Sequence, residues 1–303
     1  MTWNVRIGVN PLSWMNDDLP SLGGETPLET ALAEGREIGY AGFELGNKFP
    51  QDGPGLKATL DRFGLACVSG WYSGHLAHDT VEHEVERCVA HMDKLRFNGV
   101  KVVVYGEVAG SIQGDMKRPL RERPRFADAA AWQAYAGRLD AFGAHLKSRY
   151  GITLAYHHHM GAYVESPQDI DTLMRLTNPA SVSLLFDTGH AYYGGASDPS
   201  MLVSLLRRHA SRVVHVHCKD VRPAVIAKAR NDGWSFLAGV LAGTFTVPGD
   251  GVIDYDAVLA ALHEAGYQGW LVVEAEQDPA VAPSYAYAKK GYETLRRIVD
   301  RLS

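Results

Sequence analysis

Short apolar runs alternate with longer mixed segments along the whole chain. The runs begin near residues 5, 40, 65, 100, 151, 182, 212 and 270, and they are rich in Val, Ile and Leu. Runs of this kind are typical of strands that are buried on both faces of a parallel sheet. The segments between them predict helices at about 27–39, 54–63, 79–96, 128–149, 166–176, 198–209, 254–265 and 281–302.

Strands that alternate regularly with helices indicate an α/β protein with a parallel sheet. The pattern repeats eight times in 303 residues, which predicts one (β/α)8 TIM barrel domain spanning residues 1–303. An open doubly wound sheet is the rival architecture. It is disfavoured because no GxGxxG fingerprint follows the first strand.

Three segments carry additional local predictions. Thr26-Pro27-Leu28-Glu29 predicts a helix start with Thr26 as the cap. Residues 106–127 interrupt the alternation with basic residues and prolines, which indicates either a solvated loop or a segment that contacts substrate or a neighbouring subunit. Residues 218–250 form a long insertion, in which one helix is expected at about 223–241.

Composition and charge narrow the class of protein. The chain is 46% hydrophobic, 21% charged and has a net charge of −5, which suits a folded domain and argues against a nucleic-acid or anionic-membrane partner. The three cysteines lack CxxC spacing, and the first residues lack a signal sequence. We therefore expect a cytoplasmic protein with a small-molecule ligand, and we leave open whether it forms a homo-oligomer.

Polar side chains gather where the last four predicted strands end. Because side chains alternate across a strand, His157 shares a face with His159, and His217 shares a face with Lys219. Carboxyl ends of barrel strands meet at the face where active sites lie. Two imidazoles and two carboxylates from these four strands suit a divalent ion such as Mn²⁺, Co²⁺, Fe²⁺ or Zn²⁺. The predicted metal ligands are His157, Asp187, His217 and Glu274.

The remaining strand-end residues divide into structural and functional candidates. His158 and Cys218 point to the opposite faces of their strands and are expected to be structural. Aromatic residues after the first and third strands are interpreted either as core cover or as a platform for a sugar ring. These aromatic residues are Trp14, Trp71 and Tyr72.

The motifs resemble the xylose-isomerase-like barrel superfamily. Its shared pattern includes Asp-Thr-x-His on the sixth strand, His-x-His on the seventh and Glu on the eighth. Here Asp187-Thr188-Gly189-His190, His215-Val216-His217 and Glu274 match. A closer and more specific resemblance is to the inosose dehydratase family, carried by residues 8–20, 42–50 and 215–222 and spread from residue 8 to about 276.

This resemblance implies a reaction and cofactors. Inosose dehydratases remove water from scyllo-inosose (2-keto-myo-inositol) to give a trihydroxycyclohexane-1,2-dione, and they are described as using Mn²⁺ or Co²⁺ and glutathione. One departure concerns the fifth strand, where relatives carry a metal-binding Glu and this chain has His157. We favour His157 as the ligand there, with His159 as the alternative.

Roles follow as hypotheses. The proton-transfer candidates are Lys219, His190, His159 and Glu276. The substrate-binding candidates are Asn10, Trp14, Glu44 and Arg222, of which Asn10, Glu44 and Arg222 are assigned to hydroxyls of the keto-inositol. A neighbouring cation would lower the pKa of Lys219 and make it a base, whereas a lysine can equally serve as a fixed charge.

Three other functions stay open on the same residues. A metal-dependent keto-sugar isomerase or epimerase would form the same enediolate but return the proton. A DNA-repair nuclease of this fold is disfavoured by the acidic charge balance. A sugar-binding protein with a structural metal would bind its ligand without turnover.

Overall fold

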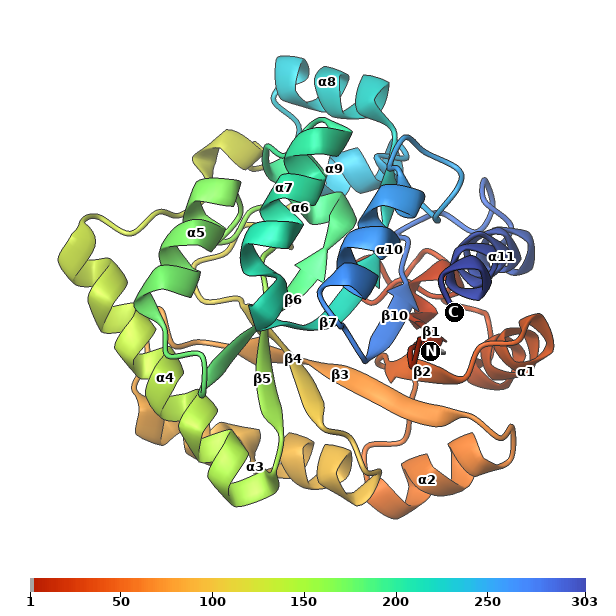
Figure 1. Cartoon of the computed structure of the whole chain (residues 1–303), viewed down its shortest axis with the longest axis horizontal. Helices are drawn as coiled ribbons and strands as arrows, with labels where there is room; N and C mark the ends of the chain where they lie inside the picture. The colour runs from red at the N-terminus through yellow and green to blue at the C-terminus, as the bar shows by residue number, and fades with distance from the viewer. Residues whose placement is uncertain (1–2) are drawn as a thin grey trace.

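The computed structural model describes residues 3–303, so residues 1 and 2 of the predicted domain lie outside the described part. It shows a closed barrel of parallel strands surrounded by helices (Figure 1). Within the described residues, hydrogen bonds join the barrel strands in the order β1-β10-β7-β6-β5-β4-β3-β2. These strands are β1 (Arg6–Val9), β2 (Gly42–Leu45), β3 (Ala66–Gly74), β4 (Val102–Glu107), β5 (Thr153–His157), β6 (Val182–Asp187), β7 (Val213–Cys218) and β10 (Trp270–Val273). The predicted TIM barrel is confirmed.

An outer layer of helices covers the barrel (Figure 1). These helices are α1 (Leu28–Ile38), α2 (Gly53–Asp61), α3 (Val81–Phe97), α4 (Ala129–Tyr150), α5 (Pro167–Leu176), α7 (Pro199–His209), α10 (Tyr255–Glu264) and α11 (Ser284–Leu302). Among the helices of residues 3–303, none combines the length and the apolar character needed to cross a membrane.

Smaller elements decorate the connections between strands and helices. They are η1 (Pro11–Ser13), η2 (Leu120–Glu122), α6 (Thr188–Gly194), η3 (Ala210–Arg212), α8 (Pro223–Asp232), α9 (Phe236–Leu241) and the antiparallel pair β8 (Asp220–Val221) and β9 (Phe245–Thr246). Helices α8 and α9 lie together at the top of the molecule in Figure 1.

The main core lies between the strands and the helices. Outward positions of the strands, such as Phe43, Leu154, Phe186 and Val216, are fully buried in one large apolar cluster with the inner faces of the helices. Burial of this apolar surface is the main favourable term in folding. The outward residues therefore stabilise the closed barrel. The inward positions can then be apolar at one end of a strand and polar at the other.

The barrel interior is apolar at one end and polar at the other. Val68, Trp270 and Val272 pack together near the start of the strands, and the Arg6 guanidinium lies 3.9 Å from the centre of the Trp270 ring. A second small cluster, of Val104, Ala155 and Leu185, lies inside the barrel. The next inward positions of β5 and β6, two residues beyond Ala155 and Leu185, are His157 and Asp187. The polar site therefore lies directly above the apolar side chains that fill the barrel interior.

Two local predictions are wrong, and one helix was not predicted. Thr26 does not cap α1, because its N–H is held in a turn by the carbonyl oxygen of Gly23 and the helix begins at Leu28 without a side-chain cap. The single helix expected at 223–241 is divided into α8 and α9, since Gly233 adopts a left-handed conformation with φ +66° that ends α8. Helix α6, which begins directly at the end of β6, was not predicted.

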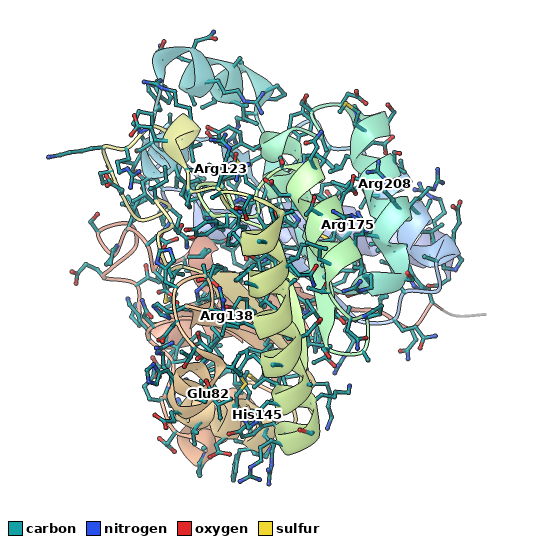
Figure 2. All side chains as sticks on the ribbon, turned by 90° about the vertical axis from the view of Figure 1, so that its left-hand side faces the viewer. Glu82, Arg123, Arg138, His145, Arg175 and Arg208 are labelled. Carbon is teal, nitrogen blue, oxygen red and sulfur yellow. The ribbon has the colours of Figure 1, made fainter. Side chains whose placement is uncertain are left out.

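The basic segment before α4 is anchored by a buried arginine. Arg123 is 8% exposed, and its guanidinium contacts Asp169 at 2.6 Å and Glu165 at 3.3 Å. Figure 2 shows Arg123 above the N-terminal end of α4, with Arg138 further along the same helix. The other basic residues of segment 106–127, such as Lys117, Arg118 and Arg121, are exposed, as expected for a solvated loop. The first part of the same segment lines the cavity over the barrel, through Val108, Ser111, Gln113 and Gly114.

Two helical glycines test the packing of this outer layer. A Cβ on Gly35 of α1 would overlap the Phe43 ring of β2, whereas a Cβ on Gly137 of α4 would meet nothing within 4 Å. We expect Gly35→Ala to destabilise the fold by about 1–3 kcal/mol through overpacking. Gly137→Ala should stabilise it by about 0.5–1 kcal/mol through helix propensity. Urea unfolding of both variants measures the difference, and equal shifts in the free energy of unfolding would contradict the packing argument.

Candidate metal centre and substrate cavity

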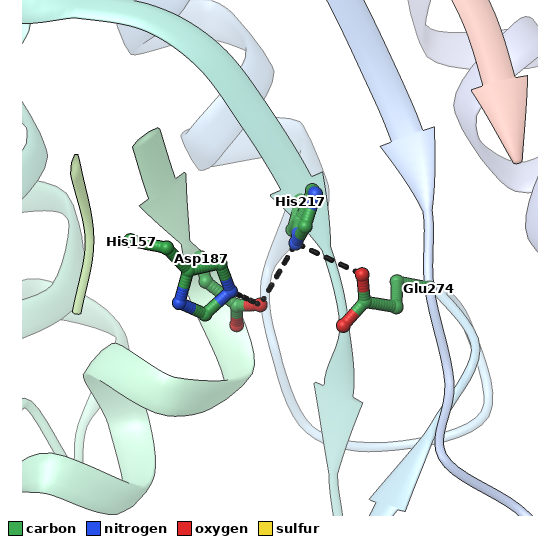
Figure 3. Close-up of side chains that lie close together, drawn as sticks. All are labelled: His157, Asp187, His217 and Glu274. Carbon is green, nitrogen blue, oxygen red and sulfur yellow. Dashed lines mark ion pairs between the residues drawn. The ribbon is translucent and has the colours of Figure 1, made fainter. Parts of the chain in front are cut away.

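Four side chains converge where β5, β6, β7 and β10 end (Figure 3). His157, Asp187 and His217 close their strands or nearly so, and Glu274 follows β10 directly. His157 Nε2 lies 3.5 Å from Asp187 Oδ2, which is also 3.5 Å from His217 Nδ1. His217 Nδ1 lies 3.0 Å from Glu274 Oε2. The sequence-predicted ligands therefore come together, and we call them the four-donor group.

The spacing of the four-donor group suits a shared ion. Ligand bonds of about 2.0–2.2 Å would place neighbouring donor atoms roughly 3.0–3.5 Å apart around one ion. One ligand atom from each of the four residues lies within 4.8 Å of all the others, and Asp187 Oδ2 is buried without a hydrogen-bond partner. A mixed set of imidazole and carboxylate donors fits a divalent transition metal. The residues present thus fit the ion that the resemblance implies.

Glu44 and Asn10 support this group from behind. Glu44 Oε1 lies 2.7 Å from His215 Nε2 and 3.1 Å from His217 Nε2, so a carboxylate orients the ring nitrogen that faces away from the group. Asn10 Nδ2 donates to Glu44 at 2.9 Å and to Glu274 at 3.0 Å. The two residues predicted to bind substrate hydroxyls therefore also fix the orientation of the donors.

A second cluster lies beside the four-donor group. Ligand-type atoms of His159, His190 and Glu276 lie within 4.8 Å of one another. Lys219 Nζ enters this cluster, at 2.8 Å from Glu276 Oε1 and 3.1 Å from His190 Nε2. All four side chains are buried. The structure therefore gathers all four residues predicted for proton transfer.

Strand alternation holds at these positions. His157 belongs to the four-donor group while His159 belongs to the second cluster, so the geometry favours His157 as the donor of β5. His158 points elsewhere, and its Nε2 accepts the N–H of Asp187 at 3.3 Å. Cys218 is fully buried in the outer apolar core.

The buried lysine is held in its charged form. Burial alone would lower the pKa of Lys219, but the carboxylates of Glu274, Glu276 and Asp187 outweigh burial and raise the pKa above its ordinary value. These carboxylates therefore stabilise the ammonium form of Lys219.

The two glutamates after β10 differ in protonation. Burial would raise the pKa of Glu274, but the neighbouring His217 and Lys219 lower it to about 2. Burial raises the pKa of Glu276 to about 7, against the opposing effect of Lys219. Such a pair allows one carboxylate to stay ionised while the other holds a proton near neutral pH.

A cavity of about 570 Å³ opens above the four-donor group. Its volume lies in the range of small-molecule sites, about 300–1,000 Å³. The predicted site residues that line it are Asn10, Glu44, His157, His159, His217, Glu274 and Glu276. Asp187, His190 and Lys219 are not among its lining residues and are 0% exposed.

Two residues predicted to bind substrate, Trp14 and Arg222, lie outside the cavity. Trp14 is 1% exposed and packs in the outer core, where its indole N–H donates to Glu34 at 2.5 Å. Arg222 ties the insertion together, because its guanidinium donates to the carbonyl oxygen of Gly243 at 3.0 Å and to Asp250 at 2.7 Å. Neither side chain lines the cavity.

The aromatic side of the cavity comes from β3. Trp71 lines the cavity, with its ring 5.4 Å from that of His157 in an edge-to-face arrangement. A Cβ on Gly106 would overlap this indole, so the glycine in β4 makes room for it. Tyr72 alternates to the outer core. Of the three aromatic candidates, Trp71 alone is placed to contact a ligand.

Other lining residues were not predicted. Asp17 and Asp18 reach the cavity from the loop after β1, and Lys94 and His91 reach it from α3. The two aspartates lie in a sequence block that resembles the family, so that resemblance could have indicated them. Nothing in the local pattern separates Lys94 and His91 from an ordinary polar helix face.

Comparisons with known proteins agree with this architecture. The family model described as "Xylose isomerase-like TIM barrel" matches residues 32–298. "Rhizopine catabolism protein MocC" of Rhizobium meliloti is 45% identical over 97% of this chain and 89% of its own length. "Inosose dehydratase" of Geobacillus thermodenitrificans is 43% identical, covering 96% of each chain.

Solved structures match at lower identity. The one titled "Crystal structure of IOLI protein with a binding zinc atom" at 1.8 Å has a TM-score of 0.61 and 16% identity, covering 98% of this chain and 97% of that one. This likeness concerns the fold. The family model and the sequence relatives confirm the family predicted from the motifs. The chain belongs to the xylose isomerase-like TIM barrel family and, within it, to the group that contains the inosose dehydratases.

Proposed function

We propose that this chain is a hydro-lyase of inositol catabolism that removes water from scyllo-inosose to give a trihydroxycyclohexane-1,2-dione. The observation that carries the proposal is the four-donor group at the floor of a polar cavity, in a chain 43% identical to a curated inosose dehydratase. A divalent ion held by His157, Asp187, His217 and Glu274 would act as a Lewis acid that polarises the substrate carbonyl.

The cavity wall suits a ring that carries many hydroxyls. The carboxylates accept hydrogen bonds from substrate hydroxyls, and the Asn10 amide donates a hydrogen bond to a hydroxyl oxygen. The face of the Trp71 ring offers an apolar surface for ring C–H groups. Asn10 and Glu44 line the cavity and contact the donors of the ion as well. We assign them to orienting the substrate against the four-donor group.

Proton transfer is assigned to the two second-cluster residues that line the cavity. His159 Nδ1 lies 2.8 Å from the carbonyl oxygen of Met160. A carbonyl oxygen only accepts, so Nδ1 carries the proton and Nε2 is left as a free acceptor. We propose that His159 Nε2 removes the proton from the carbon next to the ketone, and that Glu276 delivers a proton to the departing hydroxyl.

Lys219 stabilises the positions of Glu274 and Glu276 from outside the cavity. Its ammonium lies 2.6 Å from Glu274 Oε1 and 2.8 Å from Glu276 Oε1. It therefore fixes both glutamates and offsets their charge without contacting the substrate.

The finer assignments rest on the resemblance. Mn²⁺ or Co²⁺ as the ion and glutathione as a further cofactor are proposed on that ground. A cytoplasmic location is proposed because the three cysteines lack CxxC spacing, which fits a reducing compartment. The N/O donor set is compatible with either ion.

Metal removal tests the proposed function. We expect chelated protein to leave scyllo-inosose unchanged, because the ketone is no longer polarised, and Mn²⁺ or Co²⁺ to restore turnover. The measurement is mass spectrometry for loss of one water, with ultraviolet absorbance of the conjugated dione. A product of unchanged mass and altered stereochemistry would instead indicate a keto-sugar isomerase or epimerase, and metal-independent dehydration would contradict the proposed centre.

Substitution of the proposed base tests the roles. His159→Gln should lower kcat by about 10²- to 10⁴-fold, the usual contribution of a positioned general base. Metal content should stay unchanged, since His159 is outside the four-donor group. His145→Gln makes the same change on the outer helix α4 (Figure 2) and serves as the control. A kcat for His159→Gln within a few-fold of the control would remove His159 from the mechanism.

A further inference from the structure

The ammonium of Lys219 is surrounded by atoms that commonly bind metals. Its Nζ lies 2.6 Å from Glu274 Oε1, 2.8 Å from Glu276 Oε1, 3.1 Å from His190 Nε2 and 3.7 Å from Asp187 Oδ2. The side chain is 0% exposed. A buried cation in a shell of two carboxylates and an imidazole occupies the kind of position that a divalent ion takes in other proteins.

Two carboxylates join this position to the four-donor group. Glu274 directs Oε2 toward His217 Nδ1 at 3.0 Å and Oε1 toward Lys219 Nζ at 2.6 Å. Asp187 Oδ2 lies 3.5 Å from His217 Nδ1 and 3.7 Å from Lys219 Nζ. Two-metal sites hold their ions about 3.5–4 Å apart. The arrangement is that of a two-cation centre in which one cation is an ammonium.

We propose that Lys219 Nζ replaces a second metal ion, so that this chain holds one divalent ion where its donors would otherwise hold two. The inference rests on the proposed metal centre and deepens it. His159 adds a further ligand-type atom, which lies within 4.8 Å of those of His190 and Glu276. One lysine offsets carboxylate charge there without the dehydration of a second divalent ion.

The sequence motif after β6 makes room for this lysine. A Cβ on Gly189 would lie 2.7 Å from Lys219 Cγ and 2.9 Å from Cδ, so a larger residue would displace the lysine stem. Thr188 Oγ1 donates to the carbonyl oxygen of Lys219 at 2.8 Å and lies 3.0 Å from its backbone nitrogen. The Phe245 ring lies 4.8 Å from Nζ. Lys219 is thus held in place along its whole length.

Metal stoichiometry tests the proposal without reference to turnover. Wild-type protein and Lys219→Ala are loaded with Mn²⁺, freed of excess by gel filtration, and analysed for bound manganese by mass spectrometry and for Mn–Mn coupling by electron paramagnetic resonance. We expect one ion per wild-type chain with an uncoupled signal, and two coupled ions per Lys219→Ala chain. Lys94→Ala removes a lysine that lines the cavity, at 8% exposure, and should keep one ion.

The outcomes separate this inference from the function on which it rests. A wild type that binds no ion would refute the proposed centre and, with it, this inference. One ion in both the wild type and a folded Lys219→Ala would overturn the inference and leave the centre standing. The wild-type titration remains decisive if Lys219→Ala does not fold: a second ion bound up to millimolar Mn²⁺ overturns the proposal, and a single uncoupled ion supports it.

Discussion

The site depends on the pairing of buried charges. Glu44, Asp187, Glu274 and Glu276 are each at most 4% exposed, and a buried carboxylate is tolerated only when a cation or strong donors compensate it. Lys219 contacts three of these carboxylates, while His215 and His217 contact Glu44. The compensation raises the pKa of Lys219 and lowers that of Glu274. Removal of one partner would leave the others uncompensated, so the site behaves as one unit.

The barrel tolerates these buried charges because the outward side chains of each strand stabilise the fold while the inward side chains form the site. On β6, Phe186 faces the outer core while its neighbours Leu185 and Asp187 face inward. The outward side chains are buried in the apolar core. On the inward face, the apolar Leu185 is followed two residues later by the ionised Asp187. The cost of burying the charges is therefore offset by a core that they do not interrupt.

Strand alternation explains why much of the site could be predicted from the sequence. His157, Asp187, His217 and Glu274 each stand at the end of an apolar run, and parallel strands in a closed barrel bring such ends together. Trp14 and Arg222 could not be placed in this way, because they lie outside the barrel strands and their contacts depend on long-range packing with Glu34 and Asp250. Lys94 reaches the cavity from a helix face that looks ordinary in sequence.

Helix α6 was hidden for a related reason. It begins at Thr188 directly after β6, is capped by the Asp187 side chain, and is buried from Thr188 to Tyr193, so the sequence shows no exposed polar face to mark it. This short buried helix brings Gly189 against the stem of Lys219, which comes from the end of the neighbouring strand β7. The glycine in α6 and the lysine that follows β7 therefore depend on each other. In this chain, a larger residue at position 189 would displace the lysine stem, and the space among His159, His190 and Glu276 would then be open to another cation.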